Sequence, residues 1–205
     1  MFRKKVIQDT IVIRDVSFNY RLYFNPKNLP PIDQQYIIDN LGNRMQGDTV
    51  CLGTTAEIVE AAISRGDYQI VGFVTNSLAD DKASGVIQYW NWCNDNKDDK
   101  QIWIHDLCRI TSGEKSTVSP TEVLLLLFEK ECKRIFNKNR IIDLRLMVDR
   151  TEEGHDKLLE IYNAKYGYRI DDGCEFDVYT IMKKRIKGHE GGKTRKNKKF
   201  RPVCI

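Results

Sequence analysis

Long hydrophobic runs are absent from this sequence. No apolar stretch approaches the ~18 residues that a membrane-spanning helix requires, and the basic residues that follow Met1 lead into no uninterrupted apolar segment. We therefore expect no membrane partner and no signal peptide. The expected location is the cytoplasm.

Paired cysteines are also missing. The six cysteines form no Cys-x-x-Cys pair and follow no regular spacing. This pattern favours reduced thiols in a cytosolic protein. His155 and His189 have no cysteine or acid at the spacing of a zinc site, so the sequence predicts no metal.

A surplus of positive charge is missing from most of the chain. The formal net charge is +4, but residues 187–205 contain seven Lys or Arg residues and one Glu, which leaves −2 for the rest. Few apolar residues are available there to offset the entropy of ordering. We expect a domain at residues 1–187 and a flexible basic tail at residues 188–205, with weak non-specific nucleic-acid contact as a second role for the tail. Similar Gly-Gly-Lys-x-Arg-Lys tails occur in proteins of large DNA viruses, which would place the chain in host cytoplasm or a virion.

What is present is a strand, a loop, a helix and a second strand in the middle of the chain. Residues 101–110 alternate apolar with polar positions and include β-branched and aromatic residues, which predicts a strand. Ser119, Pro120 and Glu122 form a capping box that starts a helix. Residues 141–148 form a second apolar run, so the crossover predicts two parallel, neighbouring strands.

The helix repeats apolar residues every three or four positions, as a helix packed on a sheet does. These residues are Leu124, Leu127, Phe128, Cys132, Ile135 and Phe136.

Three further stretches resemble the GNAT family of N-acetyltransferases. Residues 158–168, which end in Lys-Tyr-Gly-Tyr, are similar to the end of that family's fourth helix. Residues 176–186 resemble its closing strand, and residues 68–75 its third strand. The resemblance covers residues 7–186 in the right order. It implies an α/β fold with a mixed, twisted sheet of roughly six or seven strands flanked by helices.

The resemblance also makes residues 56–64 a strand, although their composition would equally suit a helix. It implies that the strand at residues 101–110 parts from residues 141–148 at the C-terminal end. Residues 6–18 are expected to form the first strand or two, and residues 32–41 a short helix. Residues 86–92 are expected to form an extra strand or an extension of the third strand.

In the GNAT family, acetyl-coenzyme A lies between the two parting strands, and the loop into the next helix binds its pyrophosphate. Such binding exploits the unpaired amides at a helix N-terminus. The residues that match these two segments are Leu107, Cys108 and Arg109 on the strand, and Ser116, Thr117, Ser119, Thr121 and Glu122 in the loop and helix start. The loop lacks the family's glycines, Pro120 removes one amide, and Glu122 adds a carboxylate near the phosphates.

The resemblance assigns a proton donor for the leaving thiolate to Tyr162, because a phenol is protonated at neutral pH. A core aromatic at helical spacing is the alternative. The acceptor amine needs a general base, for which His105 could act directly and Asp106 through a water. A hydrogen-bonded structural role is the alternative for both. Trp103 and its aromatic neighbours could line an acceptor or belong to the core.

The implied activity is transfer of an acetyl group from acetyl-coenzyme A to an unknown amine acceptor, by direct attack within a ternary complex. The alternative is a catalytically inactive relative that serves as a structural or interaction protein, for example in a virion. The loop distinguishes the two, because an enzyme needs a working pyrophosphate site and a scaffold needs only the fold.

Overall fold

The computed structural model describes residues 5–42, 55–78, 81–90, 101–111, 117–135, 141–151, 154–174 and 176–187. The elements in chain order are β1 (Val6–Ile13), β2 (Val16–Phe24), the 3-10 turn η1 (Pro26–Asn28), α1 (Pro31–Gly42), α2 (Ala56–Arg65), β3 (Tyr68–Asn76), β4 (Asp81–Trp90), β5 (Gln101–Thr111), α3 (Pro120–Ile135), β6 (Ile141–Asp149), α4 (His155–Tyr166), β7 (Arg169–Ile170) and β8 (Tyr179–Lys187). The tail at residues 188–205 lies outside the described residues, so the predictions about it stay predictions.

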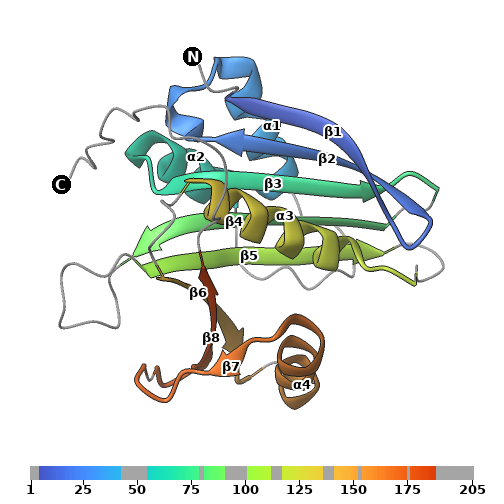
Figure 1. The fold of residues 1–205 in the computed structure, drawn as a ribbon. Coiled ribbons are helices and arrows are strands. Elements are labelled where there is room, and N and C mark those ends of the chain that lie inside the picture. The colour runs from blue at the N-terminus through green and yellow to red at the C-terminus, as the bar shows by residue number, and fades with distance from the viewer. Residues whose placement is uncertain are drawn as a thin grey trace.

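One mixed sheet carries all the described strands in the order β1-β2-β3-β4-β5-β6-β8-β7 (Figure 1). Only β5 and β6 pair in parallel; every other described pair is antiparallel. The predicted α/β class and the parallel pair are confirmed. The predicted strand count was too low, because the described sheet has eight strands. Arg14 and Asp15 turn β1 back onto β2 at φ 50° and 64°, left-handed conformations without the glycine that usually signals such a hairpin.

The segment at residues 56–64 is a helix, so the prediction of a strand was wrong. The Thr55 side chain caps α2 by accepting from the Ile58 amide, and Gly66 ends it in the left-handed conformation at φ 84°. Val59, Ala62 and Ile63 form one buried stripe at helical spacing. These local signals are present in the sequence, and they determine the structure of this segment more strongly than the family resemblance does.

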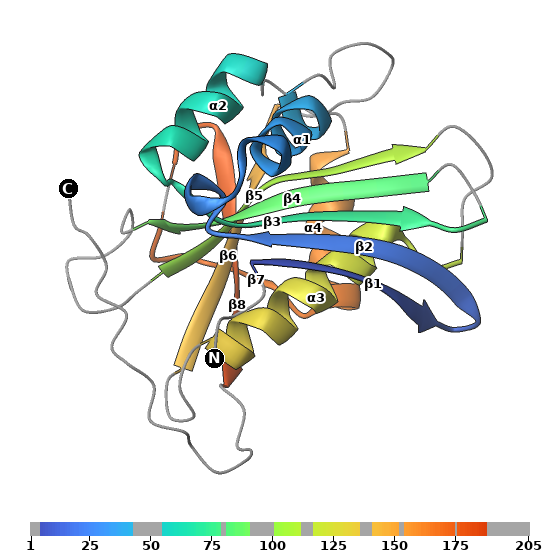
Figure 2. The ribbon, with the colours of Figure 1, turned by 90° about the horizontal axis from the view of Figure 1, so that it is seen from above.

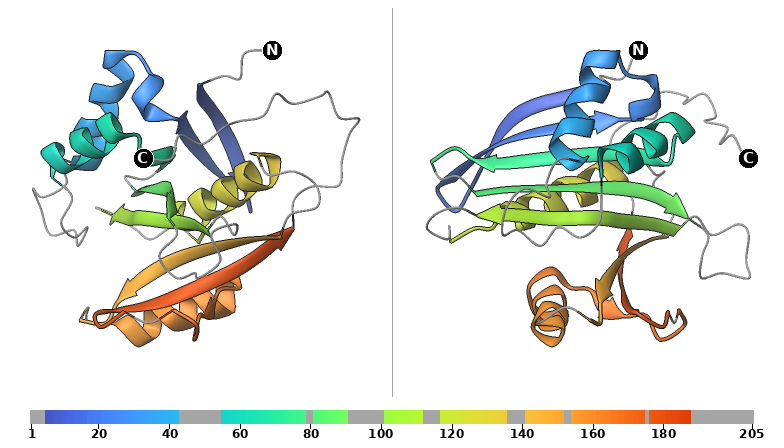
Figure 3. Two further views of the ribbon diagram at one scale, coloured as in Figure 1. Left: turned by 90° about the vertical axis from the view of Figure 1, so that its left-hand side faces the viewer. Right: turned by 180° about the vertical axis from the view of Figure 1, so that it is seen from behind.

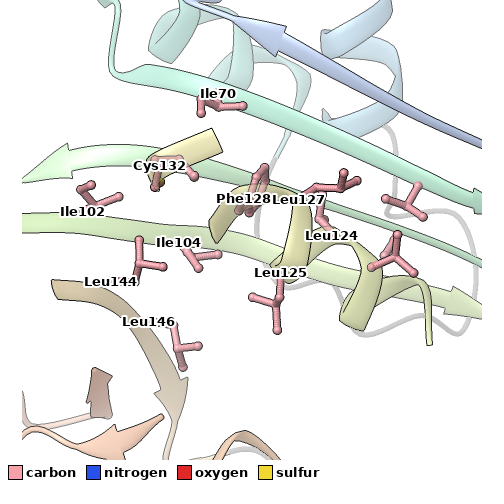
Figure 4. Packing of buried hydrophobic residues seen from close by; sticks show 14 of the residues in the cluster. Ile70, Ile102, Ile104, Leu124, Leu125, Leu127, Phe128, Cys132, Leu144 and Leu146 are labelled. Carbon is pink, nitrogen blue, oxygen red and sulfur yellow. The ribbon is translucent and has the colours of Figure 1, made fainter. Parts of the chain in front are cut away.

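Two layers of helices cover the two faces of the sheet. The helices α1 and α2 lie on one face and α3 on the other (Figures 2 and 3). The larger core cluster lies beneath α3, where Leu124, Phe128 and Cys132 face Ile70 and Ile102 (Figure 4). Leu158, Leu159 and Tyr162 of α4 pack at the edge of the same cluster.

Two glycines let α3 approach the sheet closely. Gly72 of β3 and Gly85 of β4 are direct cross-strand partners. A Cβ atom on Gly72 would lie 2.5 Å from Leu124 Cδ1 and 2.8 Å from Phe128 Cε1, whereas one on Gly85 would lie 3.3 Å from Phe128 Cε2. The Phe128 ring therefore rests on backbone at this point.

Gly72→Ala should lower the free energy of unfolding by about 1–3 kcal/mol, because the added methyl group overpacks the interface with α3. Gly85→Ala, on the paired strand with more room, is the matched control and should lose less. Urea unfolding of the two variants and the parent measures the difference. Equal midpoints for Gly72→Ala and the parent would show that α3 does not pack this closely.

Candidate functional site

The strands β5 and β6 stay together for only a short distance. They pair at Ile102 with Leu144, Trp103 with Arg145, and Ile104 with Leu146. Beyond these pairs β5 runs on to Thr111 and β6 to Asp149, and the two strands diverge (Figures 1 and 2). The predicted parting of the two strands at the C-terminal end of the parallel pair is confirmed. The space between the diverging strands is called the opening below.

A β-bulge lies where the two strands separate. On β5 the partners of Ser84 and Val86 are Cys108 and His105, so three steps along β5 face two steps along β4. A bulge adds a residue to one strand, bends it and increases its twist. The bulge lies between His105 and Cys108, so the predicted cofactor-binding residue Leu107 lies within it and Cys108 and Arg109 follow it. All three are on the part of β5 that has left β6. No residue pattern in the sequence indicated the bulge.

The three β5 residues have different side-chain partners. Leu107 packs against the core cluster under α3. The Arg109 guanidinium donates to both carboxylate oxygens of Asp81, at 2.9 and 2.7 Å, and this contact raises the pKa of Arg109. Only the backbone of this segment is therefore expected to serve a ligand.

The cysteines correct a prediction. Cys108 and Cys174 each take part in a disulfide bond in the structure, so the expectation of reduced thiols throughout was wrong. Cys132 has a free thiol, and its burial in the core raises its pKa to about 12. The spacing of cysteines could not reveal bonds that depend on the folded chain.

The start of α3 is capped, but only half of the predicted capping box forms. The Ser119 hydroxyl accepts from the Thr121 amide at 3.2 Å. The Glu122 carboxylate is directed elsewhere: it lies 2.8 Å from Lys165 Nζ of α4 and 3.4 Å from Arg14 Nη2 of the β1–β2 turn. Glu122 itself is buried, and its contact is the main reason why the pKa of Lys165 is raised.

The Glu122 cluster, defined as Glu122, Lys165 and Arg14, has two cations and one anion. Both cations remain partly exposed, with 39% and 64% of their side-chain surface accessible. Their excess positive charge adds to that of the helix N-terminus, where anions are favoured. Glu122 was expected to oppose an anion at this place, and the structure instead shows it holding two cations there.

The two tyrosines of α4 have different surroundings. Tyr162 packs against the core cluster, with its ring 6.1 Å from that of buried Tyr168. Tyr166 is partly buried, which raises its pKa, and it interacts with Lys165, Glu122 and Arg109. Tyr166 therefore lies beside the start of α3 and the end of β5, a position that its place in the sequence did not reveal.

His105 comes directly after Ile104, the last residue of β5 that pairs with β6. Its ring centroid is 6.2 Å from that of Trp103, which is fully buried. Burial lowers the pKa of His105 to about 4, so the imidazole is neutral at pH 7. Its predicted companion Asp106 lies on the same strand, but its side chain is outside the described part of the structure.

The remaining predicted residues lie around the start of α3. Thr117 is exposed, and Ser119 and Thr121 are half-buried. Ser116 lies outside the described residues. Among the described residues, no group of three or more His, Cys, Asp or Glu side chains is placed to hold a metal ion, and no helix is long and apolar enough to cross a membrane.

Comparison with solved structures identifies the fold. No family model and no curated protein matches the sequence. Solved structures do match, among them an acetyltransferase of the GNAT family from Listeria monocytogenes, with a TM-score of 0.52 at 16% identity over 87% of this chain and 100% of that chain. The chain therefore has the GNAT fold.

The buried imidazole makes stability depend on pH in a defined direction. Between the unfolded pKa of 6.5 and the folded value near 4, the unfolded chain binds a proton that the folded chain does not. Stability should therefore fall as the pH falls through this range, by about 2–3 kcal/mol at its lower end.

His105→Gln should remove this part of the pH dependence. Urea unfolding at pH 7 and at pH 4.5 measures it, and the parent should lose more stability between the two than the variant loses. Equal losses would mean that His105 is not buried in its neutral form.

Proposed function

We propose that this chain transfers an acetyl group from acetyl-coenzyme A to an amine, with the coenzyme between the diverging parts of β5 and β6. The observation that carries the proposal is the parting itself: β5 extends from His105 to Thr111 beyond its last pairing with β6. A strand edge offers backbone N–H and C=O groups to whatever lies beside it. The amides of the pantetheine arm are suited to such an edge.

The Glu122 cluster fits the pyrophosphate end of the coenzyme. Arg14 and Lys165 flank the start of α3 and would attract phosphate by charge. This compensates for the missing glycines, for the absent amide of Pro120, and for the Thr121 amide that already donates to Ser119. Phosphate binding here would rely on cationic side chains more than on backbone amides.

Acetyl-coenzyme A supplies a thioester whose carbonyl carbon an amine can attack. The amine nitrogen forms the new C–N bond, the C–S bond breaks, and the thiolate takes up a proton. His105 is neutral at pH 7 and next to the opening, so it can accept the proton that the amine loses. Asp106 is the alternative base. Tyr162 is assigned the proton donor to the thiolate, because the resemblance to the family gives a tyrosine of this helix that role.

A second candidate function is a non-catalytic structural or interaction protein. The specific observation in its favour is the start of α3, where Ser119 occupies the Thr121 amide and Pro120 has none. A scaffold needs the sheet and its helices and has no use for a phosphate site. Coenzyme binding separates the two functions.

Calorimetric titration of the full chain with acetyl-coenzyme A tests the proposal. We expect a dissociation constant between about 1 μM and 1 mM, the usual range for enzyme substrates. Lys165→Gln and Arg14→Gln should each weaken binding about 2–5-fold, equivalent to about 0.3–1 kcal/mol, and added salt should reduce the effect. Lys157→Gln, at an exposed position near the other end of α4, is the matched control and should leave affinity unchanged.

Glu122→Gln should act in the opposite direction in the same titration. Loss of the carboxylate frees both cations, so affinity should rise about 2–5-fold while stability falls, because a buried ion pair loses one partner. No binding to the parent or to Glu122→Gln at millimolar acetyl-coenzyme A would reject the enzyme and favour the scaffold.

The two tyrosines should have separable roles. Tyr162→Phe should lower kcat about 100-fold or more without changing acetyl-coenzyme A affinity, because it removes a proton donor. Tyr166→Phe removes the phenolic hydroxyl that lies beside the Glu122 cluster. This change should weaken coenzyme binding and have little effect on kcat. Release of free coenzyme A thiol gives the rate. Unchanged turnover in Tyr162→Phe would transfer the donor's role to another group.

A further inference from the structure

Arg145 is a buried arginine with unused donors. Its side chain is 10% exposed, and its Nε and Nη1 atoms are buried with no hydrogen-bond partner among the described residues. Buried polar groups are normally paired, and an unpaired donor costs free energy. Most of the N–H donors of the Arg145 guanidinium are therefore available to a ligand.

Arg145 is not needed to neutralise Asp171, the acid next to it. Arg145 Nη2 lies 3.1 Å from Asp171 Oδ2, but that oxygen has no hydrogen-bond partner in the described part of the chain, so the contact is an ion pair only. Lys183 Nζ already donates to the other oxygen of Asp171 at 2.6 Å. Two cations thus share one carboxylate, and one positive charge is left over on the buried guanidinium.

Arg145 lies at the base of the opening between β5 and β6. Its parallel partner on β5 is Trp103, one position before the strands part. Leu144 and Leu146 belong to the core under α3, so Arg145 points to the opposite face of the sheet. There its guanidinium carbon is 5.8 Å from the centre of the Trp103 ring, which is also the neighbour of His105.

We propose that Arg145 binds a carboxylate of the acceptor, so that the amines acetylated by this chain are amino acids or other amines with a carboxylate group. The inference rests on the proposed acetyl transfer and names the substrate class. A guanidinium matches a carboxylate in charge and in hydrogen-bonding geometry. The spare charge is one, which suits a carboxylate better than a phosphate monoester with its charge of about −1.5 to −2.

The test compares acids with their amides in the full chain. L-α-amino acids, ω-amino acids and their carboxamides are offered with acetyl-coenzyme A, and thiol release is measured. At least one acid should be turned over with a kcat/KM about 10-fold or more above that of its amide. In Arg145→Gln the acid should fall to the level of the amide, with acetyl-coenzyme A affinity unchanged.

Arg185→Gln is the matched control. Arg185 lies on the neighbouring strand and the same sheet face, but it is exposed and paired with Asp143. This variant should keep the preference for acids. The comparison in the unmodified chain needs no variant, so it holds even if Arg145→Gln fails to fold.

Equal use of acids and amides would overturn the inference, and so would a preference for acids that survives in Arg145→Gln. Coenzyme binding in a chain that neither acetylates nor is thermally stabilised by any of the acids would also overturn it. Absence of coenzyme binding would instead overturn the proposed function, which keeps the two failures distinct.

Discussion

The parting of β5 from β6 is the constraint on which the rest of the molecule depends. The two strands are joined through α3, and such a crossover makes them parallel. Their pairing ends at Ile104, and the bulge that follows His105 bends β5 at that point. The opening thus results from how one strand is built, and it brings the end of β5, the start of α3 and the C-terminal part of α4 to one place.

Charge then ties these elements together around the opening. Glu122 of α3 contacts Lys165 of α4 and Arg14 of the first hairpin. On the sheet face opposite α3, Asp171 forms ion pairs with Arg145 and Lys183. Each carboxylate has two cationic partners, so both places keep an excess of positive charge. Acetyl-coenzyme A and an acceptor with a carboxylate are both anionic, which makes the two clusters mutually consistent.

Local sequence patterns predicted the strands and helices whose own residues show which face is buried. The alternation in residues 101–110 and the repeat of Leu124, Phe128 and Cys132 predicted β5 and α3, because burial on one face leaves such a pattern. The helix α2 also rests on local signals, the caps at Thr55 and Gly66, and the strand implied by the family resemblance was wrong there.

Contacts between distant residues could not be predicted in this way. Glu122 was read as half of a capping box because its partners Lys165 and Arg14 lie 43 and 108 positions away in the sequence. Arg145 looked like a polar position on an alternating strand, and only the fold brings Asp171 and Trp103 to it. That Cys108 and Cys174 are each disulfide-bonded could not be predicted from the spacing of the cysteines either.

Hydrogen exchange of backbone amides, with and without acetyl-coenzyme A, tests the central claim most directly. If the coenzyme lies along the free part of β5, exchange should slow from His105 to Thr111 and in the first turn of α3. The paired segment at residues 102–104 should not change. Protection confined to other elements, or none at saturating acetyl-coenzyme A, would contradict the assignment of this opening as the coenzyme site.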